Sequence, residues 1–404
     1  MKTRDDAVLG DRSLTVAALR AAAALLWALV FSLPLEKGIE FPGLGTISRL
    51  VGWAAFAVAA LAAVRRRRLR APNAALTLAA AFTAWSALTW FWSVSRPATA
   101  SRAATMAQLF AMAWIIWEFC RTRRALFGLM AAYLAGCTAS SVWTVVRAAL
   151  NQQTNYRRFA TAGFDPNDLG ITLALALPMA LYLASRTRGA APWLCRAAAA
   201  LCIGAILLTA SRTALVAAVA AFLFSVLTWR RSTWLNRVGS VALLALFALG
   251  AMRMAPTASR QRLATLPGEL AGGTFHNRTR IWKAGVRLRA ALGVGAGAFP
   301  DAVAPTLGRS PIPTRPYTAH NTFLSVLVET GAAGFLLFGA LLLTLAFYAW
   351  TMAPWERALW LASLLVWTVG VSTLTWEHRK PTWLLFALIM ASWALIFRPG
   401  ERDS

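Results

Sequence analysis

The feature that most constrains this fold is a series of long apolar runs that recurs from one end of the chain to the other. A helix needs roughly 20 apolar residues to cross a bilayer, and these runs have that length and character. The runs expected to span are 14–35, 49–64, 72–93, 103–119, 125–146, 169–185, 197–211, 213–229, 238–253, 332–350, 357–375 and 383–397. The sequence therefore predicts an all-α polytopic membrane protein with about twelve spans, built as a single domain over residues 1–404.

Clusters of arginine follow every second apolar run. They comprise Arg65–Arg68 with Arg70, then Arg121, Arg123 and Arg124, then Arg186, Arg188 and Arg196, then Arg230, Arg231 and Arg237. Basic residues in short loops mark the cytoplasmic side, so both termini are expected there. Much of the net charge of +26 is thus a topology signal, which argues against a nucleic-acid-binding protein.

The long polar segment 254–331 is expected on the opposite, outer side, together with residues 147–168 and the turn at Ser211–Arg212. Glycine and proline within 254–331 predict two or three short helices joined by turns. Arginines on this side oppose the topology signal, so a different role is expected for them.

His320 lies in the run Thr318–Ala319–His320–Asn321, just before an amphipathic helix. The field of a helix N-terminus and neighbouring cations disfavour imidazolium, so the ring is expected to be neutral and able to accept a proton. An interfacial histidine that only caps its own helix is the alternative. The local pattern leaves both interpretations open.

Three outer arginines are candidates for binding an anion. Arg212 sits between two apolar runs, where a guanidinium is costly unless it meets an anion or reaches water. Arg278 and Arg280 lie in a short basic segment, and Arg278 shares a helix face with Trp282 four residues later. Planar guanidinium suits phosphate, although a snorkelling arginine or a solvated basic helix would explain the same pattern.

A further polar group precedes the run at 169–185. It contains Arg157, Arg158, Asp165, Asn167 and Asp168. Asp165–Pro166–Asn167 predicts a turn, and Asp168 is expected to be the N-cap of the next helix. The two carboxylates lack the spacing of a metal motif, and no histidine joins them, so no metal and no cofactor is expected.

The glycine-rich stretch Gly293–Val294–Gly295–Ala296–Gly297 does not have the spacing of a dinucleotide-binding loop. We interpret it as a tight loop whose backbone lies close to another segment.

Taken in order, these motifs resemble the bacterial O-antigen ligases, within the broader group of O-antigen ligases and polymerases. The resemblance rests on His320–Asn321 with Leu324 and Gly331, and on Arg278 four residues before Trp282. It also rests on the glycine-rich stretch, on Ser211–Arg212–Thr213 and on Gly163–Phe164–Asp165–Pro166–Asn167. These motifs cover about residues 150–335, and the rest of the chain agrees only in its hydropathy.

The resemblance implies a fold like that of the GT-C glycosyltransferases and a metal-independent, inverting transfer. The enzyme would move O-antigen from undecaprenyl pyrophosphate to a lipid A–core hydroxyl, in the inner membrane with the site facing the periplasm. By this resemblance His320 is the base, and Arg212 and Arg278 bind the pyrophosphate. Arg157, Arg158, Arg280, Asn321 and Asp168 are further candidates at the same site.

Two other functions stay open. An O-antigen polymerase of the same group would use a similar donor but a growing lipid-linked glycan as acceptor. The other is a transporter or flippase for a lipid-linked glycan with about twelve spans, although the sequence shows no inverted repeat.

Overall fold

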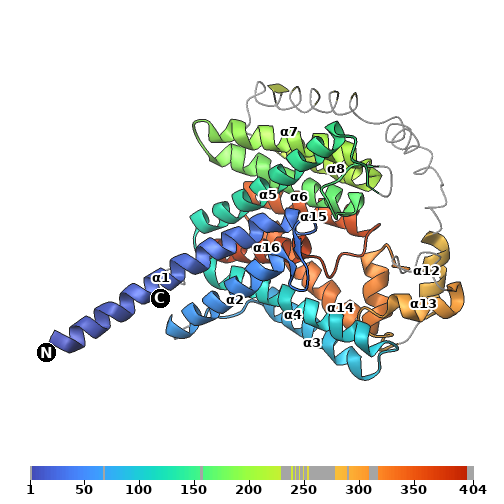
Figure 1. Cartoon of the computed structure of the whole chain (residues 1–404), viewed down its shortest axis with the longest axis horizontal. Coiled ribbons are helices and arrows are strands. Elements are labelled where there is room, and N and C mark those ends of the chain that lie inside the picture. The colour runs from blue at the N-terminus through green and yellow to red at the C-terminus, as the bar shows by residue number, and fades with distance from the viewer. Residues whose placement is uncertain are drawn as a thin grey trace.

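The architecture is a bundle of long helices that run roughly alongside one another (Figure 1). The computed structural model describes residues 2–66, 69–154, 158–228, 278–288, 291–308 and 317–397, with isolated positions between 238 and 253. Its long helices are α1 (Lys2–Ser32), α2 (Ile47–Arg66), α3 (Ala74–Leu88), α4 (Arg96–Phe119), α5 (Arg123–Ala149), α6 (Pro166–Arg186), α7 (Ala191–Thr209), α8 (Arg212–Thr228), α14 (Thr322–Thr351), α15 (Pro354–Val371) and α16 (Lys380–Phe397).

The short elements join or cover these helices. They are η1 (Leu33–Leu35), the strands β1 (Glu40–Phe41) and β2 (Gly45–Thr46), η2 (Thr89–Phe91), α12 (Arg278–Arg287) and α13 (Phe299–Leu307). Strands β1 and β2 pair antiparallel as a small hairpin between α1 and α2. The sequence does not predict this hairpin, because its two-residue strands are too short to produce an alternating pattern.

Within the described residues, eight helices are long and apolar enough to cross a membrane. They are α1, α2, α3, α5, α6, α7, α14 and α16, and α8 adds a shorter apolar stretch. The prediction of an all-α polytopic membrane protein is confirmed. The number of about twelve spans stays a prediction. The helices over the expected runs 103–119 and 357–375 are not among these eight, and the expected span at 238–253 falls almost entirely outside the described residues.

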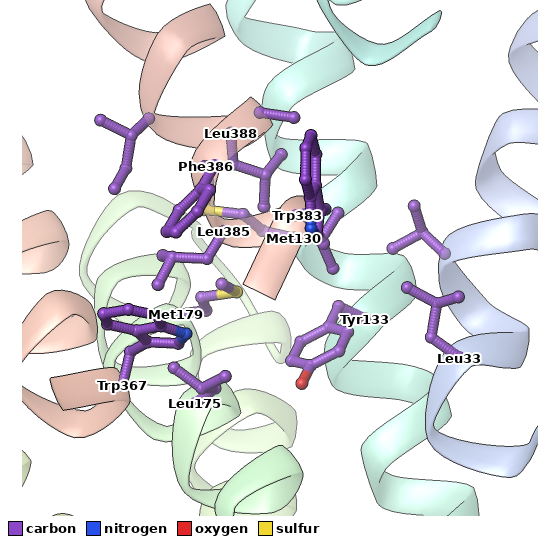
Figure 2. Close-up of a cluster of buried hydrophobic side chains, with 14 of the residues drawn as sticks. Leu33, Met130, Tyr133, Leu175, Met179, Trp367, Trp383, Leu385, Phe386 and Leu388 are labelled. Atoms are coloured by element: carbon purple, nitrogen blue, oxygen red, sulfur yellow. The ribbon is translucent and has the colours of Figure 1, made fainter. Parts of the chain in front are cut away.

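Helices α6 and α16 form the centre of the bundle. Of their apolar windows 89% and 78% is buried, against 28% for α2, so α2 lies at the periphery. Large side chains of α5, α6, α15 and α16 meet in this core (Figure 2). The rings of Trp367 and Phe386 lie 5.5 Å apart, edge to face, a favoured aromatic arrangement.

One end of the bundle carries arginines from three of the short-loop clusters, Arg70, Arg123 and Arg186. Arg123 and Arg186 both reach the Glu356 carboxylate, at 3.6 and 3.4 Å, and so connect α5, α6 and α15. At the same end of the bundle, the backbone N–H of Arg70, before α3, donates to the Glu118 carboxylate near the end of α4 over 2.8 Å. These three basic clusters therefore lie at one physical end of the bundle, whereas Arg230, Arg231 and Arg237 lie outside the described residues.

The opposite end is organised around a kink in α14. Gly331 has φ +68°, and a β-carbon there would lie 2.3 Å from the Ala291 carbonyl oxygen. The glycine-rich stretch packs against this kink: Val294 N–H donates to the Val328 carbonyl, and Gly295 N–H to that of Glu329, each over 2.9 Å. Only glycine permits so close an approach of two backbones. The interpretation of the glycine-rich stretch as a tight loop is therefore confirmed.

Helices α12 and α13 lie beside the N-terminal part of α14 (Figure 1). Their shared apolar cluster contains Ile281, Phe299, Val303 and Val328. This packing is what holds the start of α12, and with it Arg278, next to the start of α14.

Candidate active site

His320 occupies the last turn of chain before α14. Asn321 is the N-cap, and its side-chain oxygen accepts from the Leu324 N–H over 3.0 Å. The predicted helix start is therefore confirmed, and Asn321 rather than His320 performs the capping. The imidazole is left outside the helix, near its positive end, where a cationic ring is disfavoured.

The backbone at His320 is in the left-handed region, with φ +47°. Such a conformation costs a residue with a β-carbon on the order of 1–3 kcal/mol, so the surrounding contacts must enforce it. On one side, the indole N–H of Trp282 donates to the Ala319 carbonyl over 2.8 Å. On the other, the Thr322 hydroxyl donates to the Leu374 carbonyl over 2.9 Å and accepts from the Trp376 N–H over 2.8 Å.

The electrostatic surroundings keep the His320 ring neutral. Burial and the nearby Arg278 guanidinium lower the pKa of His320 to about 4, with Asp165 acting weakly in the opposite direction. The Thr318 hydroxyl lies 3.1 Å from Nε2 and is the ring's hydrogen-bond partner. When Thr318 accepts from Nε2–H, Nδ1 carries the free lone pair that a proton acceptor requires.

Arg278 is the first residue of α12, and its positive charge lowers the pKa of the His320 ring. Trp282, one turn later, anchors the His320 loop through its indole, so the spacing of four places both side chains on the side facing that loop. Arg280 lies on a different face of α12 and is exposed. The structure thus brings Arg278, but not Arg280, to His320.

Arg212 begins α8, after a sharp turn at Ala210 with φ +48°. The Ser211 hydroxyl caps the helix by accepting from the Ala214 N–H over 3.4 Å. The segment after α15 connects this turn to the His320 loop. Thr373 hydrogen-bonds to Thr213 over 2.9 Å, and the neighbouring Ser372 carbonyl accepts from the Asn321 amide over 3.3 Å.

One prediction about the segment before α6 is wrong. Asp165, not Asp168, is the N-cap of α6, since its side chain accepts from the Asn167 N–H over 2.8 Å. Pro166 follows as the first helical residue, a position for which its fixed φ is suited. Asp168 lies in the first turn instead, where its carboxylate accepts from the Trp376 indole over 2.8 Å and pairs with Arg379 at 3.0 Å.

Arg158 is buried, and one of its guanidinium nitrogens donates to the Asn167 side chain over 3.2 Å. It therefore braces the turn that carries Asp165. Arg157 lies outside the described residues. Among the residues that the structure describes, no three histidine, cysteine or acidic side chains gather in a group that would bind a metal ion.

Sequence reasoning missed a buried charged network beside this site. Arg102 of α4 lies 2.7 Å from Glu377 and 3.7 Å from Glu329, and its Nη1 is 2.8 Å from His378 Nδ1. The Gly297 N–H also donates to Glu329 over 2.6 Å. The charged run 377–380 between two apolar runs is the only sequence feature that indicates this network. No local sequence pattern links that run to Arg102.

A comparison with family models matches residues 197–339 to the family described as O-antigen ligase. The matched range includes Arg212, Arg278 and His320, which the structure places at one end of the bundle. No curated protein matches the chain.

Proposed function

The match over residues 197–339 supports membership of the O-antigen ligase family, and on that premise we propose a specific transfer reaction. The family is one of glycosyltransferase-like enzymes that act on lipid-linked polysaccharide and lipid A–core. The proposed donor is O-antigen on undecaprenyl pyrophosphate, and the proposed acceptor is a hydroxyl of lipid A–core.

In the proposed step, the acceptor oxygen forms a bond to the anomeric carbon while the bond from that carbon to the pyrophosphate oxygen breaks. His320 takes the hydroxyl proton, and undecaprenyl pyrophosphate leaves with the bonding electron pair. Attack from the face opposite the leaving group inverts the anomeric carbon. Arg212 and Arg278 stabilise the charge that develops on the pyrophosphate, so the reaction needs no metal and no cofactor.

One observation carries this proposal: a neutral histidine is held in a strained conformation beside a permanent cation. Free of substrate, His320 is a weak base because burial and the nearby Arg278 lower its pKa. When pyrophosphate neutralises Arg278, that lowering is partly removed and the imidazole becomes a stronger base. The base is therefore strengthened once the donor is bound.

The proposed orientation places this end of the bundle in the periplasm, in the bacterial inner membrane, with both termini cytoplasmic. The support is the gathering of Arg70, Arg123 and Arg186 at the other end, because basic loops are retained in the cytoplasm. A phosphatase fused after Ser404 should be inactive and a fluorescent protein there bright. The reverse result would place the site on the wrong side.

The function is tested with the purified full-length protein, undecaprenyl-pyrophosphate-linked O-antigen and lipid A–core. Glycan should appear on lipid A–core at the same rate with and without excess EDTA. Loss of transfer on chelation, restored by Mg²⁺, would overturn the metal-independent mechanism. Extension of the lipid-linked glycan without transfer to lipid A–core would identify a polymerase instead.

A further inference from the structure

A groove of about 1340 Å³ runs along the outside of α4. Its walls come from the end of α1, from the hairpin β1–β2, from α2 and from one face of α4, and the segment before α16 closes its polar end. Of the described residues that line it, none comes from α8 or α12, which carry Arg212 and Arg278. The groove therefore approaches the bundle from a different side than the two arginines.

The groove is amphiphilic along its length. Its apolar part contains Leu29, Phe56, Leu109, Met112 and Ile115. Leu109 and Met112 are buried, whereas Phe56 is 36% exposed and leaves the wall open outward. Apolar side chains along a channel at bilayer depth suit hydrocarbon chains.

The polar end of the groove carries an excess of positive charge. Glu36 pairs with Lys380, and Lys37 lies 3.8 Å from Glu40, so these charges offset one another. Arg49 is exposed and has no carboxylate partner in the described part of the chain. A guanidinium at the junction of polar and apolar walls is placed to meet a lipid phosphate.

A second, smaller cavity connects this polar end with the candidate site. It has a volume of about 200 Å³ and shares Glu36, Lys37 and Arg379 with the groove. Its other walls include Asp165 and Asp168. Asp165 is near enough to His320 to affect the pKa of the imidazole. A head group seated at Lys37 and Arg49 would thus extend its sugars towards His320.

We propose that this groove binds the acceptor, a phosphorylated glycolipid with several acyl chains, with Arg49 and Lys37 on its phosphate. The inference rests on the proposed function, because that reaction needs two lipid substrates at one base. Inversion requires the acceptor hydroxyl and the pyrophosphate on opposite faces of the anomeric carbon. The pyrophosphate belongs with Arg212 and Arg278, so the acceptor takes the groove on the other side.

The first test compares two tryptophan substitutions in the full-length protein. Ala107 of α4 lines the groove and is exposed, so Ala107→Trp fills the channel. Ala57 of α2 is exposed but does not line it, so Ala57→Trp is the matched control. Ala107→Trp should raise KM for lipid A–core at least about tenfold, while KM for the donor stays unchanged. A tenfold rise in KM corresponds to the loss of one well-buried apolar contact of the lipid. Ala57→Trp should change neither constant.

Charge is tested in parallel with Arg49→Glu and Arg49→Gln. Arg49→Glu should raise KM for lipid A–core about 10- to 100-fold, which corresponds to the loss of a charge-assisted contact. Arg49→Gln should give a smaller rise. A lipid A–core lacking its phosphates should be used equally by wild type and Arg49→Gln. An Arg49→Glu protein with a normal KM for phosphorylated acceptor would overturn the proposal.

Occupancy is measured without turnover by placing a photo-crosslinking amino acid at position 107. Labelled lipid A–core should crosslink saturably, with competition by unlabelled lipid A–core but not by undecaprenyl pyrophosphate. Saturable crosslinking of labelled undecaprenyl pyrophosphate would make this the donor groove, and non-saturable crosslinking of bilayer phospholipid would make it an ordinary lipid-facing surface. Either result overturns the proposal. Because this binding does not need transfer, a protein that binds here but transfers nothing would contradict the proposed function alone.

Discussion

Two described histidines, His320 and His378, lie partly buried at one end of the bundle, and their surroundings differ. Burial and a neighbouring arginine lower the pKa of both His320 and His378 to about 4, so both rings are neutral at pH 7. His378 Nδ1 is already engaged by Arg102 at 2.8 Å and lies 3.0 Å from Glu377. Among the described residues, the hydrogen-bond partner of the His320 ring is the Thr318 hydroxyl, which can donate or accept.

The difference shows that a lowered pKa does not distinguish a structural histidine from a reactive one. His378 carries no charge but completes a network built on the buried Arg102–Glu377 ion pair, so its role is to satisfy buried partners. His320 sits in a strained backbone conformation enforced from two sides, and it keeps hydrogen-bonding capacity for a substrate. The two regions should therefore respond differently to the same kind of substitution.

The largest contrast is expected from His320→Ala. Removing a general base typically slows proton-transfer catalysis ~10²–10⁴-fold, so transfer per folded molecule should fall in that range. Donor binding should stay close to that of wild type. Thermal stability should fall only by the lost packing of the ring, because alanine also carries a β-carbon and keeps the strained φ. Transfer at a near-normal rate by a well-folded variant would reduce His320 to a loop residue.

Arg212→Ala and Arg278→Ala should give the next largest losses of transfer rate. Each removes a preorganised donor to developing charge, worth about 2–4 kcal/mol of transition-state stabilisation. Arg→Lys at either position should recover only part of the rate, since lysine lacks the planar fork. Arg280→Ala is the matched control on the same helix, and its exposed side chain predicts little change. Equal losses in Arg278→Ala and Arg280→Ala would contradict the assignment.

Trp282→Phe should have a smaller effect. The ring is kept, but the hydrogen bond to the Ala319 carbonyl is lost, which costs roughly 1 kcal/mol and loosens the His320 loop. A decrease in kcat of roughly 3- to 10-fold with little change in KM is expected. Trp383→Phe is the matching substitution in the other region. The Trp383 indole N–H donates to the Glu377 carbonyl, so its loss should lower stability and leave kcat nearly unchanged.

His378→Ala should give the smallest change in rate. Arg102 keeps its contacts with Glu377 and Glu329, so the substitution removes one partner from a network that stays paired. The free energy of unfolding should fall by about 1 kcal/mol, measurable as a lower midpoint in thermal or denaturant unfolding of detergent-solubilised protein. A loss of kcat as large as that of His320→Ala, without loss of stability, would make the two histidines equivalent.

Features with a local cause were predictable from the sequence. The helix start after His320, the break at Ser211–Arg212 and the pairing of Arg278 with Trp282 on one face follow from capping and helical spacing. The cap of α6 was assigned to Asp168 although Asp165 performs it, because two acidic residues three positions apart are both plausible caps.

The buried network was not predictable from the same signals. Arg102 and Glu377 are 275 positions apart, and no periodicity links residues at that distance. The hydrogen bond between Trp376 and Asp168, 208 positions apart, is of the same kind. The groove is likewise built from three separate stretches of the chain, 29–56, 101–115 and 378–380, so it becomes visible only once the helices are packed.

The account's central claim is that His320 acts as the base under the field of Arg278. It is tested most directly by the pH dependence of kcat/KM for the donor, which reports ionisations of the free enzyme. In wild type the rate should fall on the acid side with a midpoint near the His320 pKa of about 4, as the imidazole becomes charged. Arg278→Gln should be slower at every pH. The midpoint of its acid limb should move to higher pH, because the cation that lowers the pKa of His320 is gone. An acid limb with the same midpoint in both proteins, or one that persists in His320→Ala, would contradict the claim.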